Sequence, residues 1–178
     1  PPDRFPQVFY RKEAVDTQLA TTEADLDLVA SARLFITNGT SLCASPSRES
    51  TYRAIEHAKR SGRLVVFDVD YRSMSWRSPE EAGLAVRLAL PWIDVLIGNQ
   101  LELTLVSGES SLDAAVGRLR QAGVPMLVSK LGEQGTRVWQ GETSVFQPPY
   151  SVDVVTTIGA GDGFASGFLY ALLQGKPV

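Results

Sequence analysis

A nearly unbroken run of apolar residues, Leu64 to Phe67 followed by Asp68, constrains the fold of this chain more than any other feature. A strand with one solvated face alternates apolar and polar residues, whereas such a run is typical of a parallel sheet covered on both faces. Parallel strands are joined by helical crossovers, so strands should alternate with helices. The pattern agrees: strands are predicted at residues 8–11, 33–37, 64–68, 95–98 and 126–129, and helices at 22–30, 47–61, from 78 onward, 99–108 and 111–122.

The last third of the chain departs from this alternation. Residues 136–140 and 143–147 are predicted to form a hairpin joined at Gly141-Glu142, and a final helix follows a glycine-rich turn. No repeat, low-complexity segment or linker divides residues 1–178. The predicted fold is therefore α/β, a mostly parallel sheet flanked by helices, with a β-hairpin before the last helix.

Capping residues mark where several helices should begin and end. Ser78 is expected to cap the helix that Pro79 begins, and Glu81 is expected to complete a reciprocal capping box with Ser78. Gly62 and Gly123 are expected to end the two helices that precede them.

Composition narrows the class of function. The chain has 178 residues, of which 44% are hydrophobic, and a net charge of −3 without a basic stripe, which argues against a nucleic-acid partner. No run approaches the ~20 apolar residues of a membrane span, and the first residues do not resemble a signal peptide. Cys43 is the only cysteine and His57 the only histidine, so no disulfide or thiolate metal site is expected. A cytoplasmic location is expected, because the chain has no disulfide framework.

The turn Gly159-Ala160-Gly161-Asp162 carries the clearest chemical signal. Apolar residues follow it at helical spacing, so the turn should lead into the first turn of a helix; these residues are Phe164, Phe168, Leu169 and Leu172. The free N–H groups and positive dipole end of a helix start bind anions, and a carboxylate beside them suits proton abstraction next to a phosphate. The alternative is that Asp162 only caps the helix.

Polar side chains follow four of the predicted strands or turns. They are Asp68, Asp70 and Arg72; Asn99 and Glu102; Lys130 and Gly132; and the turn at 159–162. Ligands of open α/β sheets gather at the carboxyl ends of the strands, so these clusters should converge on one edge. Convergence favours a catalytic role for Asp162 over capping alone.

These residues resemble the motifs of the ribokinase-like (PfkB) carbohydrate kinases. The turn Gly159-Ala160-Gly161-Asp162-Gly163-Phe164 is similar to their C-terminal signature, Asn99-Gln100-Leu101-Glu102 to their N-x-x-E motif, and Lys130-Leu131-Gly132-Glu133-Gln134-Gly135 to their nucleotide-binding turn. The resemblance implies an ATP-dependent phosphotransferase that uses Mg²⁺ and acts on a hydroxyl of a sugar or sugar acid.

The resemblance also implies a role for each matching residue. Asp162 would be the general base, and the N–H groups of Gly159, Ala160, Gly161 and Asp162 would form the anion hole. Asn99 and Glu102 would organise Mg²⁺ and the phosphates largely through water, while Lys130, Gly132, Gly135 and Asn99 would line the nucleotide side. For Asn99 and Glu102 the alternative is a plain capping box at a helix start.

Within the family, the chain most resembles kinases of inositol breakdown that phosphorylate 5-dehydro-2-deoxygluconate. The stretch from Phe67 to Arg72, followed by Trp76, and the opening Phe9-Tyr10-Arg11 carry this likeness. Arg11 and Arg72 are the expected partners of a sugar-acid carboxylate, with Tyr10 and Asp70 beside them, because a guanidinium fork suits a carboxylate. Both arginines have a surface or structural role as the alternative, and Arg72 has a phosphate contact as another.

Two departures limit the resemblance. The family signature usually begins with Asp-Thr, but Thr156 and Thr157 stand here, so a monovalent cation is not carried over. The family's N-terminal sugar-binding half and extreme C-terminus have no counterpart in this sequence, so residues 1–178 are expected to be the C-terminal catalytic portion of a kinase domain.

Other functions stay open on the sequence alone. They include a kinase of 2-keto-3-deoxygluconate, of a neutral sugar or of a nucleoside, and a non-catalytic sugar- or nucleotide-binding regulator, which the intact Asn99, Glu102 and Asp162 argue against. A dinucleotide-binding oxidoreductase is weaker still, because no G-x-G-x-x-G lies in a first βαβ unit. Small-molecule partners are expected rather than nucleic acid or membrane, and a homo-oligomer is left open.

Overall fold

The structure is a computed structural model that describes residues 13–176. The strand predicted at 8–11 lies outside the described residues, and so do Tyr10 and Arg11.

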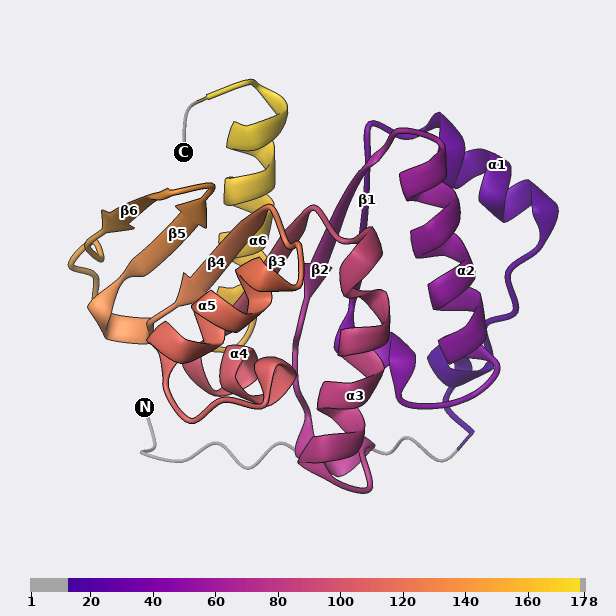
Figure 1. Ribbon diagram of the computed structural model, residues 1–178, viewed down its shortest axis with the longest axis horizontal. Coiled ribbons are helices and arrows are strands. Elements are labelled where there is room, and N and C mark those ends of the chain that lie inside the picture. The colour runs from indigo at the N-terminus through magenta and orange to yellow at the C-terminus, as the bar shows by residue number, and fades with distance from the viewer. Residues whose placement is uncertain (1–12, 177–178) are drawn as a thin grey trace.

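A single six-stranded sheet organises the described chain, in the order β1-β2-β3-β4-β5-β6 (Figure 1). The first four strands are parallel: β1 (Leu34–Asn38), β2 (Leu64–Asp68), β3 (Val95–Asn99) and β4 (Met126–Lys130). The last two, β5 (Thr136–Gln140) and β6 (Thr143–Gln147), form the predicted antiparallel hairpin at one edge. The expectation of a mostly parallel sheet with a hairpin before the final helix is confirmed.

Helices cover both faces of the sheet, but unequally. The helices before β4 are α1 (Glu23–Ser31), α2 (Ser47–Arg60), α3 (Pro79–Ala89), α4 (Gln100–Ser107) and α5 (Leu112–Gln121), and α6 (Ala160–Leu173) follows the hairpin. Each parallel strand lies next to the one before it, and right-handed crossovers that step in one direction place their helices on one face. Helices α2 to α5 therefore share a face, and α6 lies on the other (Figure 1).

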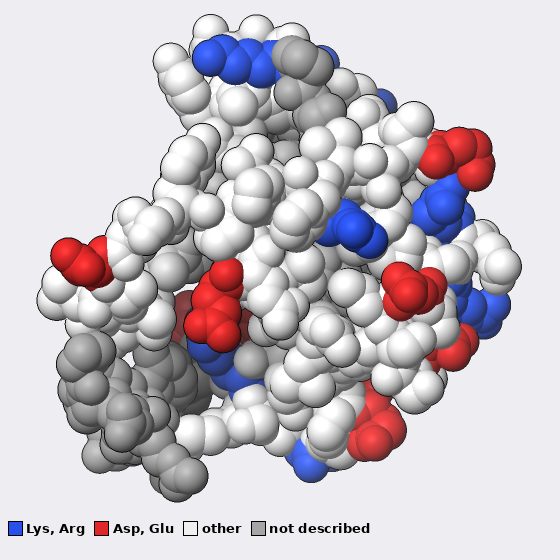
Figure 2. All heavy atoms as spheres, turned by 90° about the vertical axis from the view of Figure 1, so that its left-hand side faces the viewer, with Lys and Arg blue, Asp and Glu red and all other residues white. Residues whose placement is uncertain are grey.

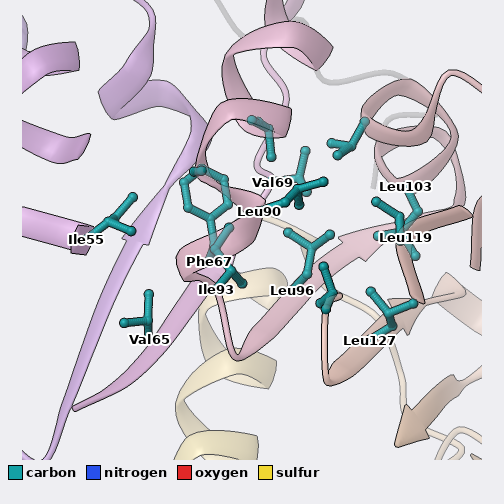
Figure 3. Packing of buried hydrophobic residues seen from close by; sticks show 14 of the residues in the cluster. Ile55, Val65, Phe67, Val69, Leu90, Ile93, Leu96, Leu103, Leu119 and Leu127 are labelled. Atoms are coloured by element: carbon teal, nitrogen blue, oxygen red, sulfur yellow. The ribbon is translucent and has the colours of Figure 1, made fainter. Parts of the chain in front are cut away.

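The two faces of the strands carry two hydrophobic cores. Phe67, Leu96 and Leu127 point toward α2–α5 and are fully buried (Figure 3). The residues next to them in sequence point the opposite way, because side chains alternate along a strand. Thus Val66, Ile97 and Val128 pack with Ala165 and Leu169 of α6. This double burial explains the unbroken apolar runs of β2, β3 and β4.

The predicted caps are mostly present, with one exception. Ser78 accepts a hydrogen bond from the Glu81 N–H at 3.2 Å, and Pro79 occupies the first turn of α3. The Glu81 carboxylate, however, accepts from the N–H of Arg77 at 3.1 Å and not from that of Ser78. The expectation of a reciprocal capping box was wrong here, because Glu81 reaches one residue further back along the chain.

The helices and one face of the molecule can be compared with what a membrane span or a charged surface would require. No helix within residues 13–176 is long and apolar enough to cross a membrane. Much of the molecular face on the hairpin side is uncharged, and the acidic and basic side chains there are interspersed (Figure 2).

Gly39, directly after β1, packs against the backbone of Val69, directly after β2, and this contact can be tested by substitution. A Cβ built on Gly39 would lie 2.1 Å from the Val69 carbonyl oxygen, a backbone atom that cannot swing aside. Gly39→Ala should therefore lower the free energy of unfolding by roughly 1–3 kcal/mol, as overpacking does. Chemical denaturation followed by circular dichroism measures this.

The matched control is Gly117→Ala in α5, where a Cβ would meet nothing within 4 Å. Because alanine is the better helix former, this change should raise stability by up to ~1 kcal/mol. Equal effects of the two substitutions would contradict the close approach of Gly39 to Val69.

Candidate functional site

The carboxyl ends of the parallel strands bring polar side chains to the face that α6 covers. Val66, Ile97 and Val128 point toward α6. Residues two positions further along a strand point the same way. The last residues of β2, β3 and β4, which are Asp68, Asn99 and Lys130, therefore share that side. Asn38 ends β1 and is paired in register with Asp68.

A cavity of about 240 Å³ lies at this edge, between the strand ends and α6. Its lining includes three carboxylates from two parts of the chain: those of Asp68 and Asp70 at and just after the end of β2, and that of Asp162 in α6. The rest of the lining consists of Ile36, Thr37, Asn38 and Ala165. Residues that are far apart in sequence thus meet in one cavity.

The three carboxylates differ in their partners. The Lys130 Nζ lies 3.0 Å from each Asp68 carboxylate oxygen, and the Arg72 guanidinium lies 2.6 Å from Asp70. Asp162 has no hydrogen-bond or ion-pair partner among residues 13–176. Two of the charges are paired with basic side chains, and the carboxylate of Asp162 is exposed.

Burial shapes the electrostatics of Asp68. Its side chain is 13% exposed and that of Lys130 is 21% exposed. Loss of hydration raises the pKa of Asp68, and the nearby Lys130 ammonium opposes that rise. The pair is thus a partly desolvated charge pair, in which removal of one partner leaves the other uncompensated.

Asp70 holds a backbone conformation that few residues adopt. Its φ of 37° lies in the left-handed region, which Asp tolerates better than most residues. Strain of this kind is concentrated at functional sites. Here it turns the chain after β2 so that Asp70 lines the cavity and binds Arg72.

The glycine turn begins α6 with unused donors. Gly159 is the N-cap residue, with φ of 79°, and no side chain caps the helix. The N–H of Gly163 donates to the Gly159 carbonyl at 2.8 Å, and that of Ala160 to the Thr157 carbonyl at 3.1 Å. The N–H groups of Gly159, Gly161 and Asp162 have no acceptor within the described part of the chain.

The contacts at the start of α6 test the capping alternative for Asp162. Asp162 is the third residue of α6 and not its N-cap, and its side chain accepts no capping hydrogen bond. The capping alternative was therefore wrong. The expected anion hole had four donors, and in this structure the Ala160 N–H is already engaged, which leaves three.

Asn99 and Glu102 form a complete capping box at the start of α4. The Asn99 side chain accepts from the Glu102 N–H at 2.9 Å, and the Glu102 carboxylate accepts from the Asn99 N–H at 2.7 Å. The other Glu102 oxygen accepts from the Tyr71 N–H at 3.0 Å, which ties α4 to the loop after β2. The capping alternative is thus confirmed as a contact, and a second lone pair on each oxygen remains for a ligand.

Glu102 is only 6% exposed, and this burial raises its pKa. The two backbone donors and the Lys130 ammonium oppose the rise, whereas the Asp68 carboxylate adds to it. The strand-end charges are therefore close enough to influence one another.

Other expected site residues lie beside this edge. Gly132 and Gly135 bracket the short 3₁₀ turn Gly132–Gln134 between β4 and β5. A second cavity, of about 450 Å³ and mostly apolar, lies between the hairpin and α6; Thr136, Gly163, Phe164 and Phe168 contribute to its lining. The first turn of α6 thus separates two cavities, with Asp162 on one side and Gly163 on the other.

A metal ion can be tested against the oxygen atoms present. Among residues 13–176, no three His, Cys, Asp or Glu side chains are grouped closely enough to bind a metal directly. Carboxylate and amide oxygens nevertheless suit Mg²⁺, which retains several waters. Asn99 and Glu102 fit a hydrated divalent cation held through water.

Sequence reasoning gave no role to two of the residues that line the cavity, Asn38 and Asp68. The available signal was strand position. Asp68 ends a predicted strand and Asn38 directly follows one, and Asp68 points to the same face of the sheet as Lys130. A salt bridge between the ends of β2 and β4 could have been inferred from that shared face together with their opposite charges.

Comparison with known proteins places the chain among sugar kinases. The model of the pfkB family carbohydrate kinases matches residues 7–178. Among curated relatives, the 5-dehydro-2-deoxygluconokinase of Photobacterium profundum is 36% identical over 174 residues, covering 94% of this chain and 53% of that protein. The enzyme of the same name from Bacillus subtilis is 32% identical, covering 99% of this chain and 55% of that protein. The chain spans about half the length of these relatives.

Solved structures agree with the fold. A PfkB protein from Polaromonas superposes with a TM-score of 0.85 at 27% identity, over 100% of this chain and 59% of its own. Fructokinase from Vibrio cholerae, solved with fructose, ADP and a calcium ion, gives a TM-score of 0.80 at 28% identity, over 93% of this chain and 53% of its own.

Glu102→Gln tests the double acceptance by Glu102. A Gln side chain has only one carbonyl oxygen, so one of the two backbone N–H groups, of Asn99 or Tyr71, would lose its acceptor. An unsatisfied buried donor costs about 1–3 kcal/mol, and the thermal midpoint should fall accordingly. Glu109→Gln, at an exposed position, is the control and should leave the midpoint unchanged. Equal midpoints for both variants would show that Glu102 does not anchor the two backbone segments.

Proposed function

Because the chain belongs to the pfkB family of carbohydrate kinases, we propose that it carries the catalytic portion of an ATP-dependent kinase for a sugar or sugar acid. One observation carries this: among residues 13–176, Asp162 is the carboxylate of the cavity that has no partner, whereas the other two are paired, and the N–H groups beside it have no acceptor there. Phosphoryl transfer asks mainly for positioning and electrostatic stabilisation, which such an arrangement supplies.

Asp162 acts as the general base in this proposal. Its carboxylate takes the proton of the acceptor hydroxyl, whose oxygen then forms a bond to the γ-phosphorus of ATP. The bond from that phosphorus to the bridging oxygen breaks, and ADP leaves with the electron pair. A positioned base of this kind contributes roughly 10²–10⁴-fold to the rate.

The start of α6 stabilises the charge that develops on the transferring group. The N–H groups of Gly159, Gly161 and Asp162 are fixed by the helix, so they need no reorganisation when charge builds up. The amide of Ala160, which the sequence also suggested, donates to Thr157 and can join only if that turn rearranges.

The two cavities on either side of this turn suit the two substrates. The cavity with the three carboxylates receives the acceptor, and the apolar one beside Gly163 receives the nucleotide. Lys130, Gly132 and Gly135 remain proposed contacts of the nucleotide. When bound, a divalent cation such as Mg²⁺ offsets phosphate charge, and Asn99 and Glu102 would hold its waters. ATP as phosphoryl donor fits a cytoplasmic enzyme.

The proposed acceptor is 5-dehydro-2-deoxygluconate, the substrate named in the relatives from Photobacterium profundum and Bacillus subtilis. Arg72 is bound to Asp70 at the rim of the cavity and can offer its guanidinium to a sugar-acid carboxylate. Tyr10 and Arg11, outside the described residues, remain proposed partners of the same group.

Asp162→Asn tests the general base. Amide and carboxylate have the same shape, so the full-length protein should stay folded while kcat falls by roughly 10²–10⁴-fold. A coupled assay of ADP release measures the rate. Asp113→Asn, in the first turn of α5, is the matched control and should retain full activity. Near-normal turnover by the Asp162 variant would remove the base assignment.

Arg72→Ala tests the choice of substrate. ADP release should be assayed over a panel that includes 5-dehydro-2-deoxygluconate, 2-keto-3-deoxygluconate, fructose and a nucleoside. If Arg72 binds a carboxylate, the loss in kcat/KM should be selective for the acids, about 1.5–3 kcal/mol as for a charged hydrogen bond. Arg60→Ala, which removes another arginine from a surface ion pair, should change neither class. An equal loss on neutral sugars would point to a phosphate contact instead.

A further inference from the structure

Lys130 lies close to the glycine turn at the start of α6, and not only beside the proposed nucleotide site. It ends β4 on the α6 side of the sheet, and its Nζ is 3.7 Å from the point where a Cβ on Gly161 would stand. The Lys130 ammonium is thus within van der Waals contact distance of that point. The positive charge of Lys130 is next to Gly161, and the N–H of Gly161 has no acceptor among residues 13–176.

Asp68 fixes that ammonium in place. Both of its carboxylate oxygens lie 3.0 Å from Nζ, so the end of a long and flexible side chain is held from two points. An ammonium has three N–H donors. Two are directed at Asp68, and the third is left for an anion bound at the turn. A donor that is already oriented costs no ordering when the anion arrives.

A second Lys–Asp ion pair in the chain differs from the Lys130–Asp68 pair in its contacts. Lys59 and Asp94 form another Lys–Asp ion pair, at the opposite, amino-terminal end of the strands. There the second oxygen of Asp94 accepts from the Val65 N–H at 2.9 Å, so that carboxylate also anchors β2. Asp68 instead directs both oxygens to its lysine and lines the cavity that contains Asp162.

We infer that Lys130 is a catalytic residue that contacts the transferring phosphoryl group at the glycine turn, and that Asp68 is the positioning residue that holds it there. This inference rests on the proposed kinase function and deepens it. Among the described residues, the Lys130 ammonium is the one charged group within 4 Å of the point where a Cβ on Gly161 would stand. The uncharged N–H groups supply direction, and the ammonium supplies charge.

The test uses the full-length protein and three variants: Lys130→Met, Asp68→Asn and the double variant. Lys130→Met should lower kcat roughly 10²-fold, the effect of losing one transition-state donor, with little change in KM for the sugar. Asp68→Asn should lower kcat less, because the lysine remains but is held less firmly. Since Asp68 acts through Lys130, the double variant should be no slower than Lys130→Met.

A binding measurement separates catalysis from folding. Titration calorimetry with ADP and Mg²⁺, with and without aluminium fluoride, reports affinity for a mimic of the transferring group. Aluminium fluoride should tighten ADP binding in the wild type and in Lys59→Met, the control for the other ion pair. It should fail to do so in Lys130→Met. The double variant keeps the test valid if Lys130→Met alone leaves Asp68 uncompensated and unfolds.

The outcomes distinguish this inference from the function on which it rests. If none of the compounds in the panel supports ADP release by the wild-type protein, the proposed function is overturned. Wild-type turnover that persists in Lys130→Met and in the double variant, with the aluminium fluoride effect intact, would overturn the role of Lys130 alone. A double variant much slower than Lys130→Met would overturn the role of Asp68 as its positioning residue.

Discussion

The alignment of strand ends is the constraint on which the rest of this structure depends. Four parallel strands step in one direction across the sheet, so their carboxyl ends meet at one edge and the crossover helices share one face. Side-chain alternation then turns Asp68, Asn99 and Lys130 toward the other face, where α6 begins. The same alternation that fills both cores therefore gathers the polar groups of the site.

Charge pairing gives that edge its chemistry. Asp68 is matched by Lys130 and Asp70 by Arg72, so among residues 13–176 only one of the three carboxylates in the cavity, that of Asp162, has no ion-pair partner. The start of α6 lies between this cavity and an apolar one, and its first N–H groups, except that of Ala160, have no acceptor within the described residues. An acceptor on one side and a nucleotide on the other would meet at a turn suited to phosphoryl charge.

Most of the fold and part of the site could be predicted from residue patterns. The boundaries of β2, β5 and β6 agree with the expected ones, because continuous apolar runs and hairpin spacing are local signals. Two local details could not be predicted from residue type. The Glu81 carboxylate accepts from the N–H of Arg77 and not from that of Ser78, and the Ala160 N–H donates to Thr157. Both depend on the exact backbone geometry of the turn. The partners of Asp68 and Glu102 come from other elements, so they appear only when the sheet is assembled.

The central claim is that the N–H groups of Gly159, Gly161 and Asp162 bind the phosphates, and amide chemical shifts measure this most directly. Adding ATP and Mg²⁺ to ¹⁵N-labelled full-length protein should shift these three resonances strongly. The amides of Val65 and Asp94, which are hydrogen-bonded at the far end of the strands, should not move. Large shifts elsewhere with an unchanged glycine turn would contradict the account.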